Sequence, residues 1–143
     1  GELTLAHSEV ITPKRRAPIH QRLQFLFKEL MRIIGELAPT ELAIEEVFAG
    51  ENKRTAMAIG HAQAAAMIAA ASHGLDVCGY APTQIKQSVT DYGGSSKEQG
   101  QQMVQVLLDL SHAPESLDVS DAIAVAICHI NASQVAHLNI MDN

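Results

Sequence analysis

The chain has 143 residues, of which 47% are hydrophobic and 18% charged, so it can bury a core, and its length favours one domain. Aromatic residues make up only 3%, which argues against a single-strand nucleic-acid binder built on aromatic stacking. The net charge is −6, but residues 1–97 hold all ten Lys and Arg against ten acids, and residues 98–143 hold six acids and no base. The negative average therefore does not describe the whole chain, and it leaves room for basic clusters.

The cysteines and the apolar stretches indicate the cellular location of the protein. Cys78 and Cys128 have no CxxC spacing and cannot form a disulfide framework, so we expect a reducing, cytoplasmic location. The most apolar stretch, 56–71, is mostly alanine and is shorter than a membrane span. We therefore expect no membrane segment.

The predicted elements alternate between strand and helix. Residues 3–11 resemble a strand closed by a proline, and Pro18 opens a helix whose apolar positions recur at helical spacing up to Leu37. The next elements are a strand over 41–48, a helix over 55–72 ended by Gly74, and a strand over 75–80. Three helices follow: one over 82–90, one opened by Ser95 and Glu98, and one over about 119–129 with Asp118 as N-cap. We expect the tail at 131–143 to be frayed. This order predicts an α/β fold in one domain over residues 1–143, although three strands are few for such a sheet.

Two glutamates interrupt the apolar strand over 41–48. Glu45 and Glu46 are neighbours, so they point to opposite faces of the strand. One can face solvent, and the other then points at a partner, because a buried carboxylate is costly unless it is paired, hydrogen-bonded or bound to a metal ion. The alternative is an edge strand with both acids in solvent.

Two aspartates lie three residues apart where the last helix is predicted to begin. Asp118 and Asp121 therefore share one face, with Cβ atoms about 5–6 Å apart. Acids are also common at helix starts as caps, but the apolar run 122–128 buries this helix and brings its acidic end to the core. Carboxylates from a strand and a helix start suit Mg²⁺ or Mn²⁺, and two such ions roughly 4 Å apart can clamp a phosphodiester. The seven histidines have no zinc-ligand spacing.

Basic residues flank the segments that carry these acids. Lys53 and Arg54 follow the glutamate strand, and Lys86 and Lys97 lie on either side of a glycine-rich loop. Each alone is ordinary surface charge, but together they would surround a carboxylate site with positive groups, as a phosphate-bearing polymer requires. The alanine-rich helix over 55–72 either packs in the core or forms a self-association face.

Five segments also carry a resemblance to a known family. They are LAIEEVF at 42–48, the helix from Asn52 to Ala71 with Gly60-His-Ala-Gln63, YAPTQIKQ at 80–87, the loop ending at Lys97, and DVSDAIAVAICH at 118–129. In this order and spacing they resemble RuvC, the bacterial crossover-junction endodeoxyribonucleases or Holliday junction resolvases. The resemblance covers nearly the whole chain and implies a ribonuclease-H-like mixed sheet flanked by helices.

The resemblance also implies an activity. It implies a Mg²⁺-dependent homodimer, with two ions per active site or Mn²⁺ in their place, that hydrolyses paired phosphodiesters at four-way (Holliday) DNA junctions in recombination and repair. The helix over 55–72 would form the dimer, and branch-migration proteins would be further partners. The residues concerned are Glu45, Asp118 and Asp121 for catalysis and metal binding, and Phe48, Lys86 and Lys97 for DNA, to which Lys53 and Arg54 are added on charge alone.

The chain departs from the family at its start. The family begins with a strand carrying Gly-x-Asp-x-Gly, whose aspartate is a fourth metal ligand, and this sequence begins at Gly1 without that motif. We therefore expect an N-terminally truncated chain that does not cleave junctions alone. The alternatives are a catalytically incomplete remnant that binds junctions or dimerises, and another nuclease of this fold that acts on other structured DNA or RNA.

Overall fold

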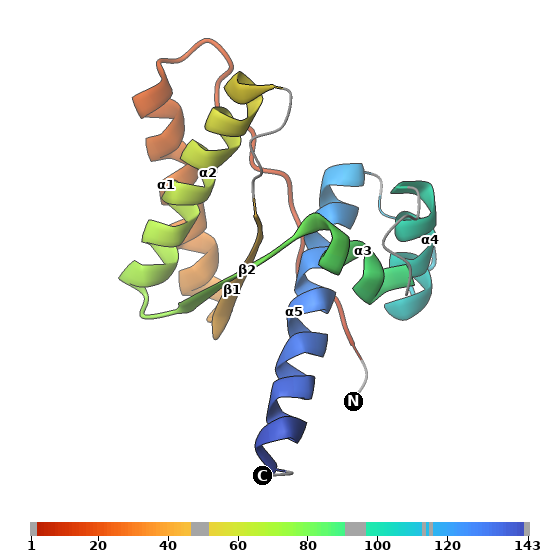
Figure 1. The fold of residues 1–143 in the computed structure, drawn as a ribbon. Coiled ribbons are helices and arrows are strands. Elements are labelled where there is room, and N and C mark those ends of the chain that lie inside the picture. Colours follow the sequence, from red (N-terminus) through yellow and green to blue (C-terminus); the bar gives the residue numbers. More distant parts are fainter. Residues whose placement is uncertain (1–2, 47–51, 91–96, 113, 115, 142–143) are drawn as a thin grey trace. The chain divides into compact units, whose positions relative to one another are not determined.

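The computed structural model describes residues 3–46, 52–90, 97–112, 114 and 116–141, with only the backbone described for residue 97 and for 136–141. The chain divides into two compact units (Figure 1). We call residues 11–79 the strand unit, and residues 1–10 with 80–143 the helical unit.

The strand unit begins with helix α1, Ile19–Leu37, which confirms the helix predicted from Pro18 and the apolar spacing. Pro18 precedes the first helical residue, where a missing N–H costs nothing. The helix ends because Ala38 adopts a left-handed conformation, and its backbone N–H donates to the Ile34 carbonyl at 2.9 Å. Ile34 is the buried residue of the apolar face.

The rest of the strand unit is a strand–helix–strand segment. Strand β1, Glu41–Glu45, leads to helix α2, Lys53–Ser72, and then to strand β2, Asp76–Tyr80, whose last residue belongs to the helical unit. β1 and β2 pair in a two-stranded parallel sheet, so α2 is the crossover between them. Asn52 caps α2 by accepting the Thr55 N–H at 3.1 Å, and Gly74 follows its end with a positive φ of 73°.

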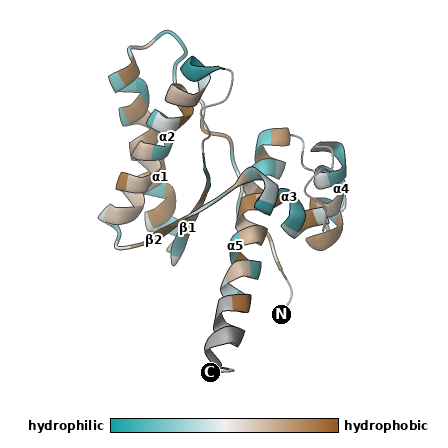
Figure 2. Ribbon diagram, in the orientation of Figure 1, coloured by the Kyte–Doolittle hydropathy of each residue, from teal (hydrophilic) through white to brown (hydrophobic). Residues whose placement is uncertain are grey.

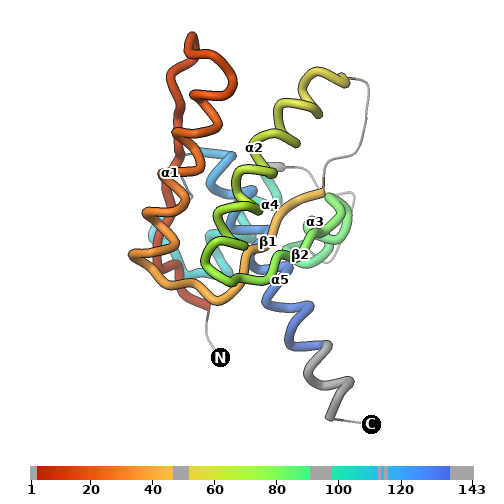
Figure 3. The backbone as a smooth tube through the Cα atoms, turned by 90° about the vertical axis from the view of Figure 1, so that its left-hand side faces the viewer, coloured from red at the N-terminus to blue at the C-terminus, as the bar shows by residue number. Residues whose placement is uncertain are grey.

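α1 and α2 pack against each other and run in the same direction (Figures 1 and 3). This follows from the chain path, because β1 lies between them in the sequence and returns the chain to the end where α1 began. The first residues of both helices therefore lie at the same end of the strand unit.

The helical unit contains α3, Pro82–Thr90, α4, Lys97–Leu107, and α5, Leu117–Met141, each packed against the other two. Its core is a cluster of aliphatic side chains from all three helices: Val89, Val104, Ile123 and Ile127. Leu3 of the N-terminal segment packs against this cluster. None of the described helices is long and apolar enough to cross a membrane.

Three sequence expectations need correction. Residues 3–11 form no strand in the described structure, because they have no ladder partner there and Leu3 packs on the helical core instead. α5 continues to Met141, beyond the end predicted at about 129, since no Gly or Pro interrupts it. Asp118 is not its N-cap: the Ser116 hydroxyl accepts the Asp118 N–H at 3.1 Å. The predicted cap Ser95 lies outside the described residues.

Candidate metal and nucleic-acid site

Glu45 is the last residue of β1, and its backbone is held by α2. The Gln63 side-chain amide donates a hydrogen bond to the Glu45 backbone carbonyl, which ties the end of the strand to the crossover helix. Glu46 lies over β2, where a Cβ added to Gly79 would be 3.1 Å from its Cγ and Oε1. Both glutamates are exposed, which agrees with the alternative in which both acids of this strand face solvent. The Glu45 carboxylate is therefore accessible to a ligand.

Asp118 and Asp121 lie in the first two turns of α5. Asp118 is exposed and Asp121 is half-buried, and their spacing puts both carboxylates on one face of the helix. The residues that follow are largely buried, which confirms that α5 enters the core directly after its acidic end: Ile123, Val125, Ile127 and Cys128. The aspartate pair therefore lies at the boundary between core and solvent.

The carboxylates divide between the two units. Glu45 belongs to the strand unit and the aspartate pair to the helical unit. Within either unit, the described residues contain no group of three His, Cys, Asp or Glu side chains that could hold a metal ion. The donor chemistry nonetheless suits Mg²⁺, since all three candidate ligands are carboxylates that solvent can reach at least in part.

The candidate DNA-binding residues lie on helix surfaces where the structure describes them. Lys53 and Arg54 are exposed in the first turn of α2, and Lys86 is exposed on α3. Lys97 is the first residue of α4, but its side chain lies outside the described part of the chain, as does all of Phe48. The side chains of Lys53, Arg54 and Lys86 are thus accessible to an anionic ligand.

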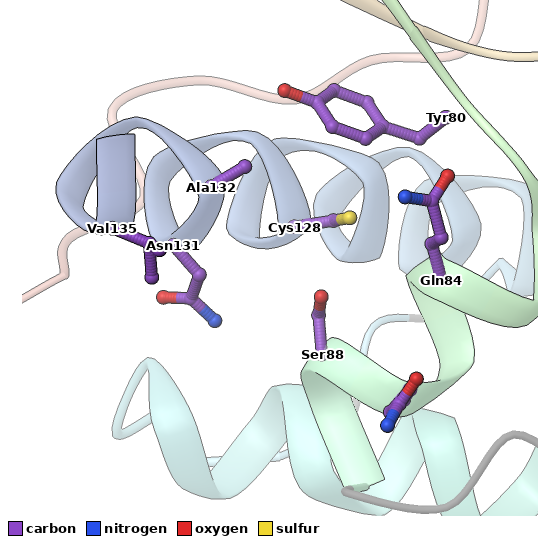
Figure 4. Close-up of a pocket in the computed structure, with 8 residues that line it drawn as sticks. Tyr80, Gln84, Ser88, Cys128, Asn131, Ala132 and Val135 are labelled. Carbon is purple, nitrogen blue, oxygen red and sulfur yellow. The ribbon is translucent and has the colours of Figure 1, made fainter. Parts of the chain in front are cut away.

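A groove of about 450 Å³ lies within the helical unit, and no motif in the sequence predicted it. Tyr80 borders it, and its hydroxyl lies 2.6 Å from Nδ1 of His129, with the two ring centroids 5.7 Å apart. This contact links the end of β2 to α5, and Figure 4 shows side chains of α3 and α5 around the space. The lining residues are Tyr80, Gln84, Gln87, Ser88, Cys128, Asn131, Ala132 and Val135.

An α/β fold with carboxylates at a strand end and a helix start has the residue types of metal-dependent phosphodiester-cleaving enzymes. The sequence model of Crossover junction endodeoxyribonuclease RuvC matches residues 1–129, and the chain belongs to this family. The protein of that name from Dehalococcoides mccartyi is 48% identical over 140 residues, covering 98% of this chain and 83% of the relative. The one from Alkaliphilus oremlandii is 42% identical over 134 residues, covering 94% and 81%.

Solved structures agree with this assignment. The Thermus thermophilus RuvC structure has a TM-score of 0.87 at 28% identity, covering 94% of this chain and 81% of its own. T. thermophilus RuvC in complex with Holliday junction substrate has a TM-score of 0.89 at 28% identity, covering 94% and 82%. The predicted ribonuclease-H-like α/β fold is therefore confirmed.

Proposed function

We propose that this chain binds four-way DNA junctions and supplies catalytic groups of a crossover-junction endodeoxyribonuclease that acts in homologous recombination and repair. The observation that carries the proposal is the TM-score of 0.89 to RuvC bound to a Holliday junction substrate, over 94% of this chain. The relatives that bear the endonuclease name, at 42–48% identity, support the same activity.

We infer that Glu45, Asp118 and Asp121 bind divalent cations, as two Mg²⁺ or Mn²⁺ ions. Ions held by these carboxylates would supply activation of a water nucleophile and charge stabilisation at the leaving 3′ oxygen. The chain's own contribution is to present the carboxylates: Gln63 fixes the backbone that carries Glu45, and Ser116 fixes the first turn of α5. The exposure of Glu45 and Asp118 leaves room for a phosphate beside them.

DNA contacts are proposed for the residues expected from sequence. Lys53, Arg54 and Lys86 are exposed cations that can meet phosphates, which give affinity without reading sequence. Lys97 and the aromatic Phe48 stay predictions from the family resemblance, Lys97 as a cation near the cut and Phe48 as a contact to an unpaired base.

We further propose a homodimer that forms through α2. This helix contains no acidic residue, is rich in Ala, and exposes large apolar side chains at Met57 and Ile68. A dimer would bring two sets of catalytic residues to one junction and so make paired cuts. Cytoplasmic location and assembly with branch-migration proteins remain predictions of the same kind, as does a single nuclease domain over residues 1–143.

The test is cleavage of a labelled four-way junction by the full-length protein that carries this chain, with Glu45→Gln as the variant. We expect Mg²⁺-dependent nicking by the parent protein and a loss of at least about 100-fold in the variant, because an amide is a poor ligand for a hard cation. Junction binding should remain within about twofold. Glu41→Gln, at the other end of β1, is the control and should nick normally.

A loss of binding as large as the loss of nicking would contradict the assignment of Glu45 as a metal ligand. Equal cleavage of linear duplex, or of an RNA–DNA hybrid, would instead indicate a different nuclease of this fold. Junction binding without nicking by the parent protein would support the non-catalytic alternative.

A further inference from the structure

One end of the strand unit collects basic side chains from two segments that are distant in the sequence. Lys14, Arg15 and Arg16 form the turn before α1, and Lys53 and Arg54 form the first turn of α2. All five are exposed. Because α1 and α2 begin at the same end of the unit, their basic residues lie at that end too, and both segments are hydrophilic in Figure 2. We call these five residues the basic end.

The turn that carries Lys14, Arg15 and Arg16 is well defined. The Ala17 N–H donates to the Lys14 carbonyl at 3.1 Å, and Pro13 and Pro18 bracket the turn in sequence. Proline fixes φ and so lowers the entropy lost when a segment binds. The three cations are therefore presented together.

Acidic residues are scarce around the basic end. Residues 10–28 contain no acid, and neither does α2. None of the five cations forms an ion pair with another described residue, whereas Arg32, further along α1, pairs with Glu29 at 2.8 Å and Glu36 at 3.2 Å. Glu51, the nearest acid in sequence, lies outside the described residues. Five exposed charges of one sign produce a positive field that favours a polyanion.

We propose that the basic end binds the phosphate backbone of a duplex arm of the junction, and that Lys14, Arg15 and Arg16 extend the DNA surface that begins at Lys53 and Arg54. The inference rests on the proposed function, since junction DNA is the polyanion that it supplies. The contact carries no sequence information, because the basic end offers charges to phosphates and no groove-reading element. Its contribution is affinity that falls steeply with salt.

The experiment compares two variants with the same loss of charge in the full-length protein. Arg15→Gln/Arg16→Gln neutralises two residues of the basic end, and Lys28→Gln/Arg32→Gln neutralises two residues further along α1. Junction Kd is measured over a salt series in Ca²⁺ or without metal, and thermal melting checks that both variants are folded. We expect the first variant to raise Kd about tenfold at low salt and to reduce the slope of log K against log salt by about 1 to 2, since each phosphate contact contributes about 0.9. The control should keep the parent slope.

Two results of the salt series would overturn the inference. One is a parent-like slope for Arg15→Gln/Arg16→Gln, and the other is an equal effect of both variants, which would indicate net charge alone. Binding of the basic end to anionic vesicles, with junction affinity unchanged by the first variant, would overturn it in favour of a membrane. Failure of the proposed function looks different, because the parent protein would then show no preference for junctions and no Mg²⁺-dependent nicking.

Discussion

Ser120 lies between the two candidate metal-binding aspartates, is 4% exposed, and has a side-chain hydroxyl without a hydrogen-bond partner among the described residues. A buried hydroxyl that loses its water without gaining a partner costs about 1–3 kcal/mol. We therefore expect Ser120→Ala to raise the free energy of unfolding by about 1 kcal/mol. Urea unfolding followed by circular dichroism measures this change.

The same substitution four residues earlier should have the opposite effect. Ser116 accepts the Asp118 N–H, so Ser116→Ala removes an N-cap and should lower the free energy of unfolding by about 0.5–2 kcal/mol. If both alanine variants were destabilised alike, Ser120 would have a partner in the folded protein, and the argument from its unpaired hydroxyl would be wrong.

Among the helices and strands, the contact that bears most directly on the candidate site joins α2 to β1. Gln63 donates to the backbone carbonyl of Glu45, so it fixes the end of the strand without touching the carboxylate itself. We expect Gln63→Leu to lower junction nicking by roughly tenfold or more, because a small displacement of a catalytic group is costly, while junction Kd stays within about twofold.

The control for this positioning role is Gln24→Leu, the same change at an exposed residue of α1, away from the proposed dimer face. It should nick at the parent rate. Partial rescue of Gln63→Leu by a higher Mg²⁺ concentration would support a misplaced ligand, whereas equal losses of nicking and binding would point to a general disturbance of α2.

Helices with clear boundaries were predictable from the sequence. The start of α1 followed from Pro18 and the end of α2 from Gly74, because these residues restrict or permit specific backbone angles. The segment 3–11 was not predictable, since alternation identifies a strand only where a partner strand exists. The length of α5 was missed because weak periodicity in 131–141 hid a stretch without helix breakers.

The candidate site was predictable only in part. The shared face of Asp118 and Asp121 was predictable from their spacing within one helix. The structure also agrees that this helix enters the core after them. The link from Gln63 to Glu45 spans 18 residues, and that from Tyr80 to His129 spans 49. Such contacts depend on tertiary packing, which no local pattern encodes.

At the scale of the whole molecule, charge is divided between the units. The strand unit carries eight of the ten Lys and Arg, against seven acids, and the helical unit carries two Lys against nine acids. We therefore expect attraction to DNA to originate mainly in the strand unit, and we expect the acids of the helical unit to bind cations more readily than phosphates. Bound cations reverse the local field, so an acidic helix start can still lie beside a phosphate.

A second molecular property is the proposed dimer, which depends on the exposed face of α2. Met57 is 63% exposed and Ile68 is 59% exposed, and they are eleven positions apart, which is about three helical turns, so both lie on one face. Placing a charge within such an interface buries it without a partner. We expect Ile68→Glu to convert the dimer to a monomer, as measured by sedimentation equilibrium.

The matched control is Val106→Glu on α4, where a side chain that is 70% exposed receives the same charge away from α2. It should leave the dimer intact. In the full-length protein, Ile68→Glu should also convert paired cuts into single nicks on a supercoiled plasmid that extrudes a cruciform, because one active site then acts without its partner. Two outcomes would contradict a dimer interface on α2. One is a dimer that persists with Ile68→Glu, and the other is a dimer that dissociates equally with Val106→Glu.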